Sequence, residues 1–183
     1  GEGTYEVLKA IGLKLNLPVR EAERVDVSGA AMSSSTIRQH VFSGDFLWAR
    51  KMLGRPYSIV GSVIQGDQRG RTIGFPTLNV SLESLAFPPR GVYGVLVKVG
   101  GQSHLGAANI GVRPTVDPKR TQPLLEVHLL DFTGDLYGRE VEVEFQFKIR
   151  DEQKFDSLDA LKQQLARDVE EVRRRVLHQD TQR

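Results

Sequence analysis

A glycine-rich segment between residues 61 and 79 carries the residue types best suited to binding a phosphate group. Its glycines leave the backbone free to approach a ligand closely, and exposed backbone amides suit phosphate oxygens. Arg69 and Arg71 add positive charge to the same loop. The glycines concerned are Gly66, Gly70 and Gly74. Composition alone leaves an ordinary glycine-rich strand connection as the alternative. A P-loop is excluded, because three residues rather than four separate Gly66 from Gly70 and no Lys follows.

The end of this segment could hold a divalent cation. Pro76 fixes its own φ and restricts Phe75, so the chain is held extended there. In an extended chain Thr77 and Asn79 point the same way. A hydroxyl and an amide oxygen on one face suit Mg²⁺, which takes its other oxygens from water and nucleotide phosphates. On the residues alone, a turn satisfied by Thr and Asn is the favoured alternative.

Glu126 is an acidic residue inside an otherwise apolar stretch, residues 124–129. A carboxylate in that setting is expected to be half-buried with a raised pKa, which suits a general base. Alternation along a strand places Glu126 and His128 on one face, so a solvent-facing pair is the alternative. We interpret His128 as structural.

The elements that must position these residues are mainly strands. From Tyr57 onward, stretches rich in β-branched residues alternate with turns, and Gly100-Gly101 predicts a hairpin. The predicted strands cover residues 57–64, 91–99, 102–110, 124–130 and 140–149. This spacing favours an antiparallel barrel or sandwich. A stripe of apolar residues from Leu158 to Val176 then predicts a helix, capped by Ser157 or Asp156, that packs on the strands.

Composition excludes several classes of function. The 183 residues include no cysteine, which rules out disulfides, zinc thiolate sites and cysteine nucleophiles and is compatible with the cytoplasm. The formal net charge is only +2 and aromatic residues make up 7%, so we expect no nucleic-acid partner. No apolar run is long enough to span a membrane, so no membrane partner is expected.

Five segments, in order along the chain, resemble the riboflavin kinase family. The first, Gly74-Phe75-Pro76-Thr77-Leu78-Asn79, is similar to the family signature Gly-Phe-Pro-Thr-Ala-Asn, with Leu78 in place of Ala. Leu78 faces away from Thr77 and Asn79 in a strand, so the metal site should survive. The others are Gly91-Val92-Tyr93, residues 106–115, residues 125–132 with Leu136-Tyr137-Gly138, and residues 149–158.

The resemblance implies a mainly β fold. It would be a closed, antiparallel, Greek-key barrel of about six strands with a C-terminal helix. It also implies Mg²⁺-dependent transfer of the γ-phosphate of ATP to the 5′-hydroxyl of riboflavin, giving FMN and ADP. Glu126 would be the general base, Thr77 and Asn79 the metal ligands, and Arg113 and Arg150 substrate contacts. The ATP-binding residues would be Gly66, Arg69, Gly70, Arg71, Gly74, Pro76, Thr77 and Asn79. The alternative is a non-catalytic barrel that binds a flavin or a nucleotide.

The N-terminal third, residues 1–53, precedes the predicted kinase domain at 54–183 and is mostly helical in pattern. It resembles the end of the α/β FMN adenylyltransferase domain that precedes the kinase in bacterial bifunctional enzymes. The resemblance rests on Ser34, Ser35, Thr36 and Arg38, which are similar to the nucleotidyltransferase signature Ser-Ser-Thr-x-x-Arg compressed by one residue. A simple helix N-cap is the alternative. Because these residues follow no His-x-x-His element, we expect FMN adenylylation only in a longer parent protein.

Overall fold

The structure is a computed structural model, and it divides into two compact units, residues 1–33 and 34–183. It describes residues 4–21, 26–27, 30–66, 70, 73–82, 87–114 and 121–180. The first unit contains helix α1 (Tyr5–Leu15) and the short antiparallel strands β1 (Asp26–Val27) and β2 (Ala30–Ala31). Thr4 Oγ1 accepts a hydrogen bond from Val7 N at 3.5 Å, and Asn16 ends α1 with a left-handed backbone.

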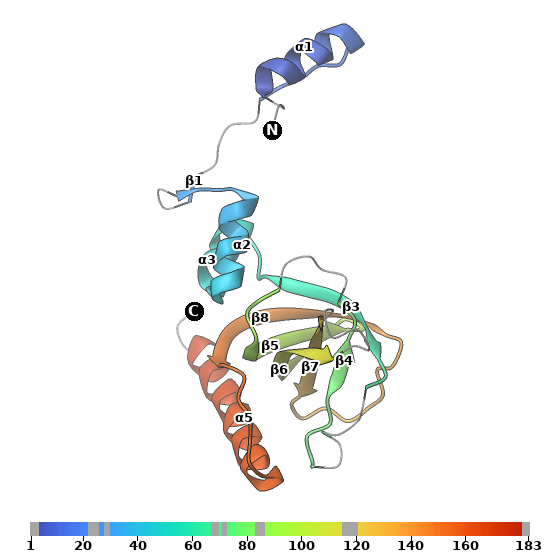
Figure 1. The fold of residues 1–183 in the computed structure, drawn as a ribbon, viewed down its shortest axis with the longest axis vertical. Helices are drawn as coiled ribbons and strands as arrows, with labels where there is room; N and C mark the ends of the chain where they lie inside the picture. Colours follow the sequence, from blue (N-terminus) through green and yellow to red (C-terminus); the bar gives the residue numbers. More distant parts are fainter. Residues whose placement is uncertain are drawn as a thin grey trace. The chain divides into compact units, whose positions relative to one another are not determined.

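The second unit is built on a closed barrel of six strands, as Figure 1 shows. The strands are β3 (Ser58–Ile64), β4 (Leu78–Val80), β5 (Gly91–Val99), β6 (Gln102–Pro114), β7 (Thr121–Leu129) and β8 (Glu140–Arg150). Their order around the barrel is β3-β4-β7-β6-β5-β8, with every neighbouring pair antiparallel. Strands β5, β6 and β7 follow one another, and β8 returns beside β5, which is a Greek key. The predicted barrel is confirmed.

Alternation along the strands puts one set of side chains inside the barrel. Tyr93, Val97, Ala108, Leu125, Val127 and Val143 are fully buried there. Tyr93 donates a hydrogen bond from its hydroxyl to the carbonyl oxygen of Pro89, and burial raises the pKa of that hydroxyl. Because the core uses one face of each strand, the opposite face is left for ligands and flanking helices.

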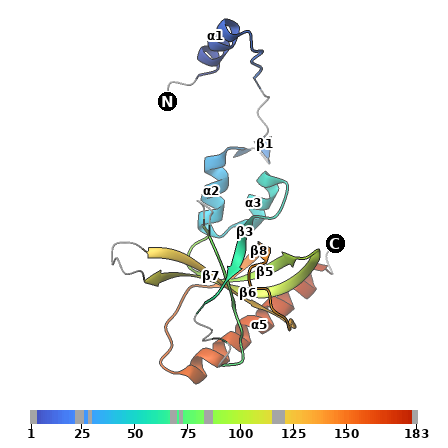
Figure 2. The ribbon, with the colours of Figure 1, turned by 90° about the vertical axis from the view of Figure 1, so that its right-hand side faces the viewer.

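In the described part of this unit, the helices longer than one turn are α2 (Ser34–Ser43), α3 (Phe46–Leu53) and α5 (Leu158–Asp180). Asp45 caps α3 by accepting a hydrogen bond from Trp48 N at 3.2 Å, and Ser157 caps α5 through Ala160 N at 3.1 Å. Figures 1 and 2 show α5 running along one side of the barrel. Val172, in the second half of α5, is fully buried. Among the helices in the described part of the chain, none is long and apolar enough to cross a membrane.

Helix α3 is joined to the barrel by an aromatic cluster. The Phe46 ring is 5.4 Å from that of Phe145, 5.7 Å from that of Tyr93 and 6.3 Å from that of Tyr57, measured between centroids. Only 4% of Phe46 is exposed, so its ring belongs to the barrel core although its helix lies outside. Helices α2 and α3 therefore belong to the same compact unit as the barrel. The predicted boundary between an adenylyltransferase remnant and the kinase domain, at residues 53 and 54, stays a prediction.

We predict that Phe46→Ala lowers the free energy of unfolding of the barrel by about 3–5 kcal/mol, because it leaves a cavity among three aromatic rings. Leu47→Ala is the matched control on the same helix, since 64% of Leu47 is exposed. The control should change stability by no more than about 0.5 kcal/mol. Urea denaturation followed by tyrosine and tryptophan fluorescence measures both. Equal midpoints for the two variants would show that Phe46 is not part of the core.

Candidate functional site

Three polar residues stand side by side across three neighbouring strands. Asn79 of β4 is opposite Glu126 of β7, and Glu126 is opposite Asn109 of β6. Their sequence neighbours Val127 and Ala108 are fully buried in the core. Because side chains alternate between the two faces of a strand, the polar row lies on the outer face of the barrel. The register thus assembles a carboxylate flanked by two amides, and we call Asn79, Glu126 and Asn109 the polar row.

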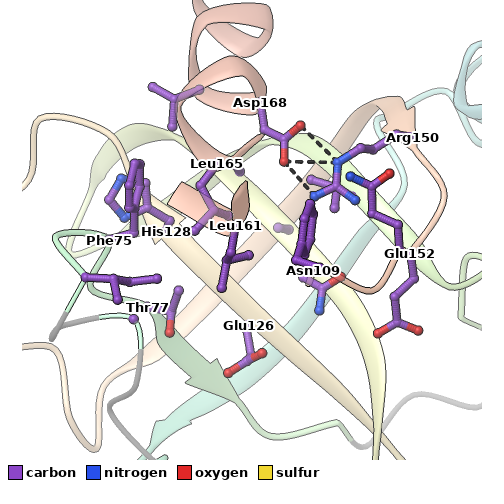
Figure 3. A pocket seen from close by; sticks show the side chains of 18 of the residues that line it. Phe75, Thr77, Asn109, Glu126, His128, Arg150, Glu152, Leu161, Leu165 and Asp168 are labelled. Carbon is purple, nitrogen blue, oxygen red and sulfur yellow. Dashed lines mark hydrogen bonds and ion pairs between the residues drawn. The ribbon is translucent and has the colours of Figure 1, made fainter. Parts of the chain in front are cut away.

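A cavity of about 580 Å³ lies over two members of this row, between the barrel and helix α5. In Figure 3, Glu126 and Asn109 are drawn among its lining side chains, with Leu161 and Leu165 of α5 beside them. Its walls are mainly apolar, and its polar lining includes Glu126, Asn109 and Glu152. Other lining residues include Ile73, Phe75, Thr77, Val92, His128, Arg150, Phe155, Asp168 and Val169. Such a cavity suits an amphipathic small molecule. The apolar stripe of α5 therefore has two parts. Its first half lines the cavity, and Val172 in its second half is buried.

The glycine-rich loop is held against the predicted metal ligands. A Cβ added at Gly66 would lie 1.8 Å from Asn79 Nδ2 and 2.7 Å from its Oδ1, and one at Gly70 would lie 3.4 Å from Thr77 Oγ1. The loop backbone can approach Asn79 only because Gly66 lacks a Cβ, whereas a Cβ at Gly70 would meet the carbonyl oxygen of Phe75 at 2.2 Å. Gly70 also accepts hydrogen bonds from Ile73 N (3.2 Å) and Phe75 N (2.8 Å), which closes a tight turn. The backbone at position 74 has a φ of +87°, a left-handed conformation that favours glycine.

The hydroxyl of Thr77 and the amide oxygen of Asn79 fit Mg²⁺ as neutral oxygen ligands. Asn79 is 6% exposed and lies beneath Gly66, while Thr77 lines the cavity. Leu78, between them, packs against the hydrophobic core, as expected for the opposite face. Within the described residues no cluster of three His, Asp or Glu side chains could hold a metal by itself. A cation here would need further oxygens from water and a phosphate.

His128 joins strand β7 to the segment that carries Thr77. Its Nδ1 is 2.8 Å from the carbonyl oxygen of Pro76, and its ring meets that of Phe75 edge to face at 5.3 Å (Figure 3). A carbonyl only accepts hydrogen bonds, so Nδ1 carries the proton. The structural interpretation of His128 agrees with this geometry, although its ring also lines the cavity.

A second cavity of about 610 Å³ lies on the other side of Thr77. It is formed by the 76–78 segment and by the loop that follows β7, where Tyr137 N donates to Asp135 Oδ1 at 2.9 Å. Its lining is Pro76, Thr77, Leu78, Leu129, Phe132, Thr133, Gly134, Asp135, Leu136 and Tyr137. Thr77 is common to both linings, so the two cavities adjoin at a predicted metal ligand.

The structure brings several predicted site residues together. Glu126, Thr77, Gly70 and Arg150 line the first cavity, and Pro76 lines the second. Arg69 and Arg71 lie outside the described residues, as does the side chain of Arg113. The signature residues Ser34, Ser35, Thr36 and Arg38 begin helix α2, where Arg38 Nη2 donates to Ser35 Oγ at 3.4 Å. They line neither cavity.

Sequence reasoning missed three features of the site. Asn109 was given no role, although it lies opposite Glu126, because strand register cannot be read from one strand. Asp168 receives no role from the sequence, yet it is only 1% exposed. The loop lining the second cavity contains Leu136-Tyr137-Gly138, a motif noted without a function.

Fold and site together define a small antiparallel barrel with two adjoining cavities of a size that suits small molecules. A family model for riboflavin kinase matches residues 53–176. The chain therefore belongs to the riboflavin kinase family.

Curated bacterial proteins named bifunctional riboflavin kinase/FMN adenylyltransferase are similar to the chain. The protein from Pseudomonas fluorescens is 44% identical over 173 residues, covering 93% of this chain and 55% of that protein. The protein from Escherichia coli strain K12 is 45% identical over 168 residues, covering 91% and 53%. The chain spans about half the length of these relatives. A crystal structure from Streptococcus pneumoniae, named a macrolide-efflux protein, is similar with a TM-score of 0.78 and 36% identity, over 94% of this chain and 55% of that one.

We predict that Gly66→Ala displaces the Asn79 side chain, because a methyl group cannot occupy a position 1.8 Å from its Nδ2. The side-chain amide signals of Asn79 in a ¹H–¹⁵N spectrum should shift. Gly54→Ala is the control. It introduces a Cβ at a left-handed glycine with no atom within 4 Å, so it should cost stability without moving those signals. Unchanged Asn79 signals in the Gly66 variant would contradict the packing described.

Proposed function

We propose that this chain transfers the γ-phosphate of ATP to the 5′-hydroxyl of riboflavin, producing FMN and ADP. One observation carries the proposal. Glu126 stands between Asn79 and Asn109 on the floor of a cavity that meets a second cavity at Thr77. A transfer between two substrates needs two binding sites that meet where the group moves, with a base at that point.

The first cavity suits riboflavin. Its apolar wall, formed by Phe155, Leu161 and Leu165, offers contact area for the flat isoalloxazine ring. Asn109 and Glu152 offer an amide and a carboxylate for the hydroxyl groups of the ribityl chain. With the ring against α5, the ribityl chain extends toward Glu126, which brings the 5′-hydroxyl to the carboxylate.

The second cavity suits the nucleotide. Phe132, Leu136 and Tyr137 supply apolar surface for a base, and the glycine-rich loop supplies backbone amides for phosphates. Thr77 and Asn79 would hold Mg²⁺, which neutralises phosphate charge when it is bound. The ATP contacts predicted for Gly66, Arg69, Gly70, Arg71 and Gly74 belong to this part of the proposal, and so does Pro76, which lines the cavity.

Glu126 acts as the general base. It takes the proton of the 5′-hydroxyl while that oxygen forms a bond to the γ-phosphorus. The bond from the γ-phosphorus to the bridging oxygen breaks, and ADP leaves with the electron pair. Glu126 is partly buried and its neighbours across the sheet are neutral amides, so no second carboxylate stands directly opposite it in the row.

A non-catalytic flavin- or nucleotide-binding barrel is the alternative. Such a module needs one cavity and has no use for a carboxylate in a cavity that adjoins a second one. The position of Glu126 near the shared residue Thr77 therefore favours the kinase.

We also propose that residues 54–183 form the kinase domain and that residues 1–53 derive from an FMN adenylyltransferase domain. The whole protein would then adenylylate FMN to FAD, as the names of its relatives state for those proteins. A cytoplasmic location is proposed because ATP is the co-substrate and the chain contains no cysteine.

We predict that Glu126→Gln lowers kcat for FMN formation by about 10²–10⁴-fold, because the amide cannot accept the proton. Nucleotide binding should survive, since the substitution is isosteric. Glu142→Gln makes the same change on β8, where Glu142 lies 3.8 Å from Lys98, and should leave turnover intact. Chromatography of riboflavin, ATP and Mg²⁺ incubations measures the product.

Near-normal turnover by Glu126→Gln would remove Glu126 as the base while keeping the kinase. A folded wild-type chain that forms no FMN would refute the kinase itself. The same chromatogram tests the expectation that residues 1–183 make no FAD from FMN and ATP.

A further inference from the structure

An ion pair with a buried carboxylate joins the end of strand β8 to helix α5 in the wall of the first cavity. Arg150 Nε donates to both carboxylate oxygens of Asp168, at 3.0 and 3.1 Å, and Arg150 Nη2 donates to Oδ2 at 2.8 Å. The side chains are 18% and 2% exposed. Both residues line the cavity, and Figure 3 shows the dashed contacts between them.

The pair is completed by neighbours that satisfy its remaining groups. Gln164 Nε2 donates to Asp168 Oδ1 at 2.9 Å, and Arg150 Nη1 donates to the carbonyl oxygen of Asp151 at 3.0 Å. A buried carboxylate is costly unless it is paired and hydrogen-bonded, and here both oxygens are used. The orientation of the guanidinium is therefore fixed from two sides.

The same guanidinium supports an apolar wall residue. Its central carbon lies 5.7 Å from the centre of the Phe155 ring. On the other side of the pair, Leu161 and Leu165 precede Asp168 by seven and three residues, which places them on the same helix face. The ion pair therefore adjoins the apolar wall on two sides. Arg150 lies beside Phe155, and Asp168 follows Leu161 and Leu165 on one face of α5.

We propose that Arg150 and Asp168 are positioning residues that set the width of the riboflavin cavity by fixing α5 and Phe155 relative to the barrel. This inference rests on the proposed kinase function. In this role Arg150 acts on the substrate through the cavity wall, whereas the role predicted from the sequence is a direct contact with substrate. The two roles give different kinetics.

The chain supplies a matched control for the pair. Arg173 of α5 also bonds toward the barrel, through Asp131 just after β7, at 2.8 Å between Nη2 and Oδ1. That pair is solvent-exposed, at 42% and 72%, and neither residue lines the cavity. The hydrogen bond from Arg173 lowers the pKa of Asp131, so the pair is ionised at neutral pH.

The test compares Asp168→Asn, Arg150→Gln, the double variant and the control Asp131→Asn. We expect Asp168→Asn to raise the KM for riboflavin by about tenfold or more, with the KM for ATP within about twofold of wild type. Arg150→Gln should raise the riboflavin KM by the same factor. The double variant should have a riboflavin KM no higher than that of either single variant, because both substitutions break the same ion pair. Asp131→Asn should behave as wild type.

Equal riboflavin KM values in wild type and Asp168→Asn would overturn the proposal. So would a loss in Arg150→Gln that falls on kcat or on ATP, because that result indicates direct contact with a phosphate. If Asp168→Asn does not fold, Gln164→Ala tests the proposal instead. It removes the hydrogen bond from Gln164 to Asp168 and keeps the ion pair. It should raise the riboflavin KM about threefold, and no change would count against the proposal.

Quenching of riboflavin fluorescence separates this inference from the proposed function. The dissociation constants should follow the same order as the KM values without any turnover. If the wild-type chain forms no FMN, the proposed kinase function is refuted. If the wild-type chain forms FMN and Asp168→Asn has the same riboflavin KM and dissociation constant, only the positioning role is refuted.

Discussion

The site depends on the hydrogen-bonded register between strands β4, β7 and β6. That register places Asn79, Glu126 and Asn109 in one row on the outer face, while Val127 and Ala108 fill the core. Because side chains alternate with a period of two, a slip of one residue in β7 would bury Glu126 and expose Val127. The hydrophobic core and the polar row therefore enforce one another, and barrel closure leaves no free edge in this sheet along which to slip.

The loop glycines and helix α5 supply the remaining parts of the site. Gly66 lets the loop backbone lie against Asn79, and the turn around Gly70 brings Thr77 to the point where the two cavities meet. Helix α5 supplies the opposite wall, and it is linked to β8 by Arg150 and the buried carboxylate of Asp168. A phosphoryl-transfer site built this way works by positioning and needs little covalent chemistry from the protein.

Much of this arrangement could be predicted from the sequence, because period-two alternation and turn glycines are local signals. The strand at residues 91–99 and the helix beginning after Ser157 were both predicted with their correct starts. Asn109 and Asp168 could not be assigned, because their roles depend on partners 17 or more residues away in the chain. Glu126 gained its role from the family resemblance, since alternation alone placed it equally well toward solvent. The contacts of α3 with the barrel were also missed, because Phe46 reads as an ordinary apolar helix residue until Tyr93 and Phe145 lie beside it.

The central claim is that a substrate hydroxyl meets Glu126 in the first cavity, which adjoins the second at Thr77. A crystal structure of the chain with riboflavin, ADP and Mg²⁺ tests it most directly. The account predicts the 5′-hydroxyl within about 3 Å of the Glu126 carboxylate, the cation on Thr77 and Asn79, and the isoalloxazine ring against α5. A flavin bound elsewhere, or one whose ribityl chain points away from Glu126, would contradict it.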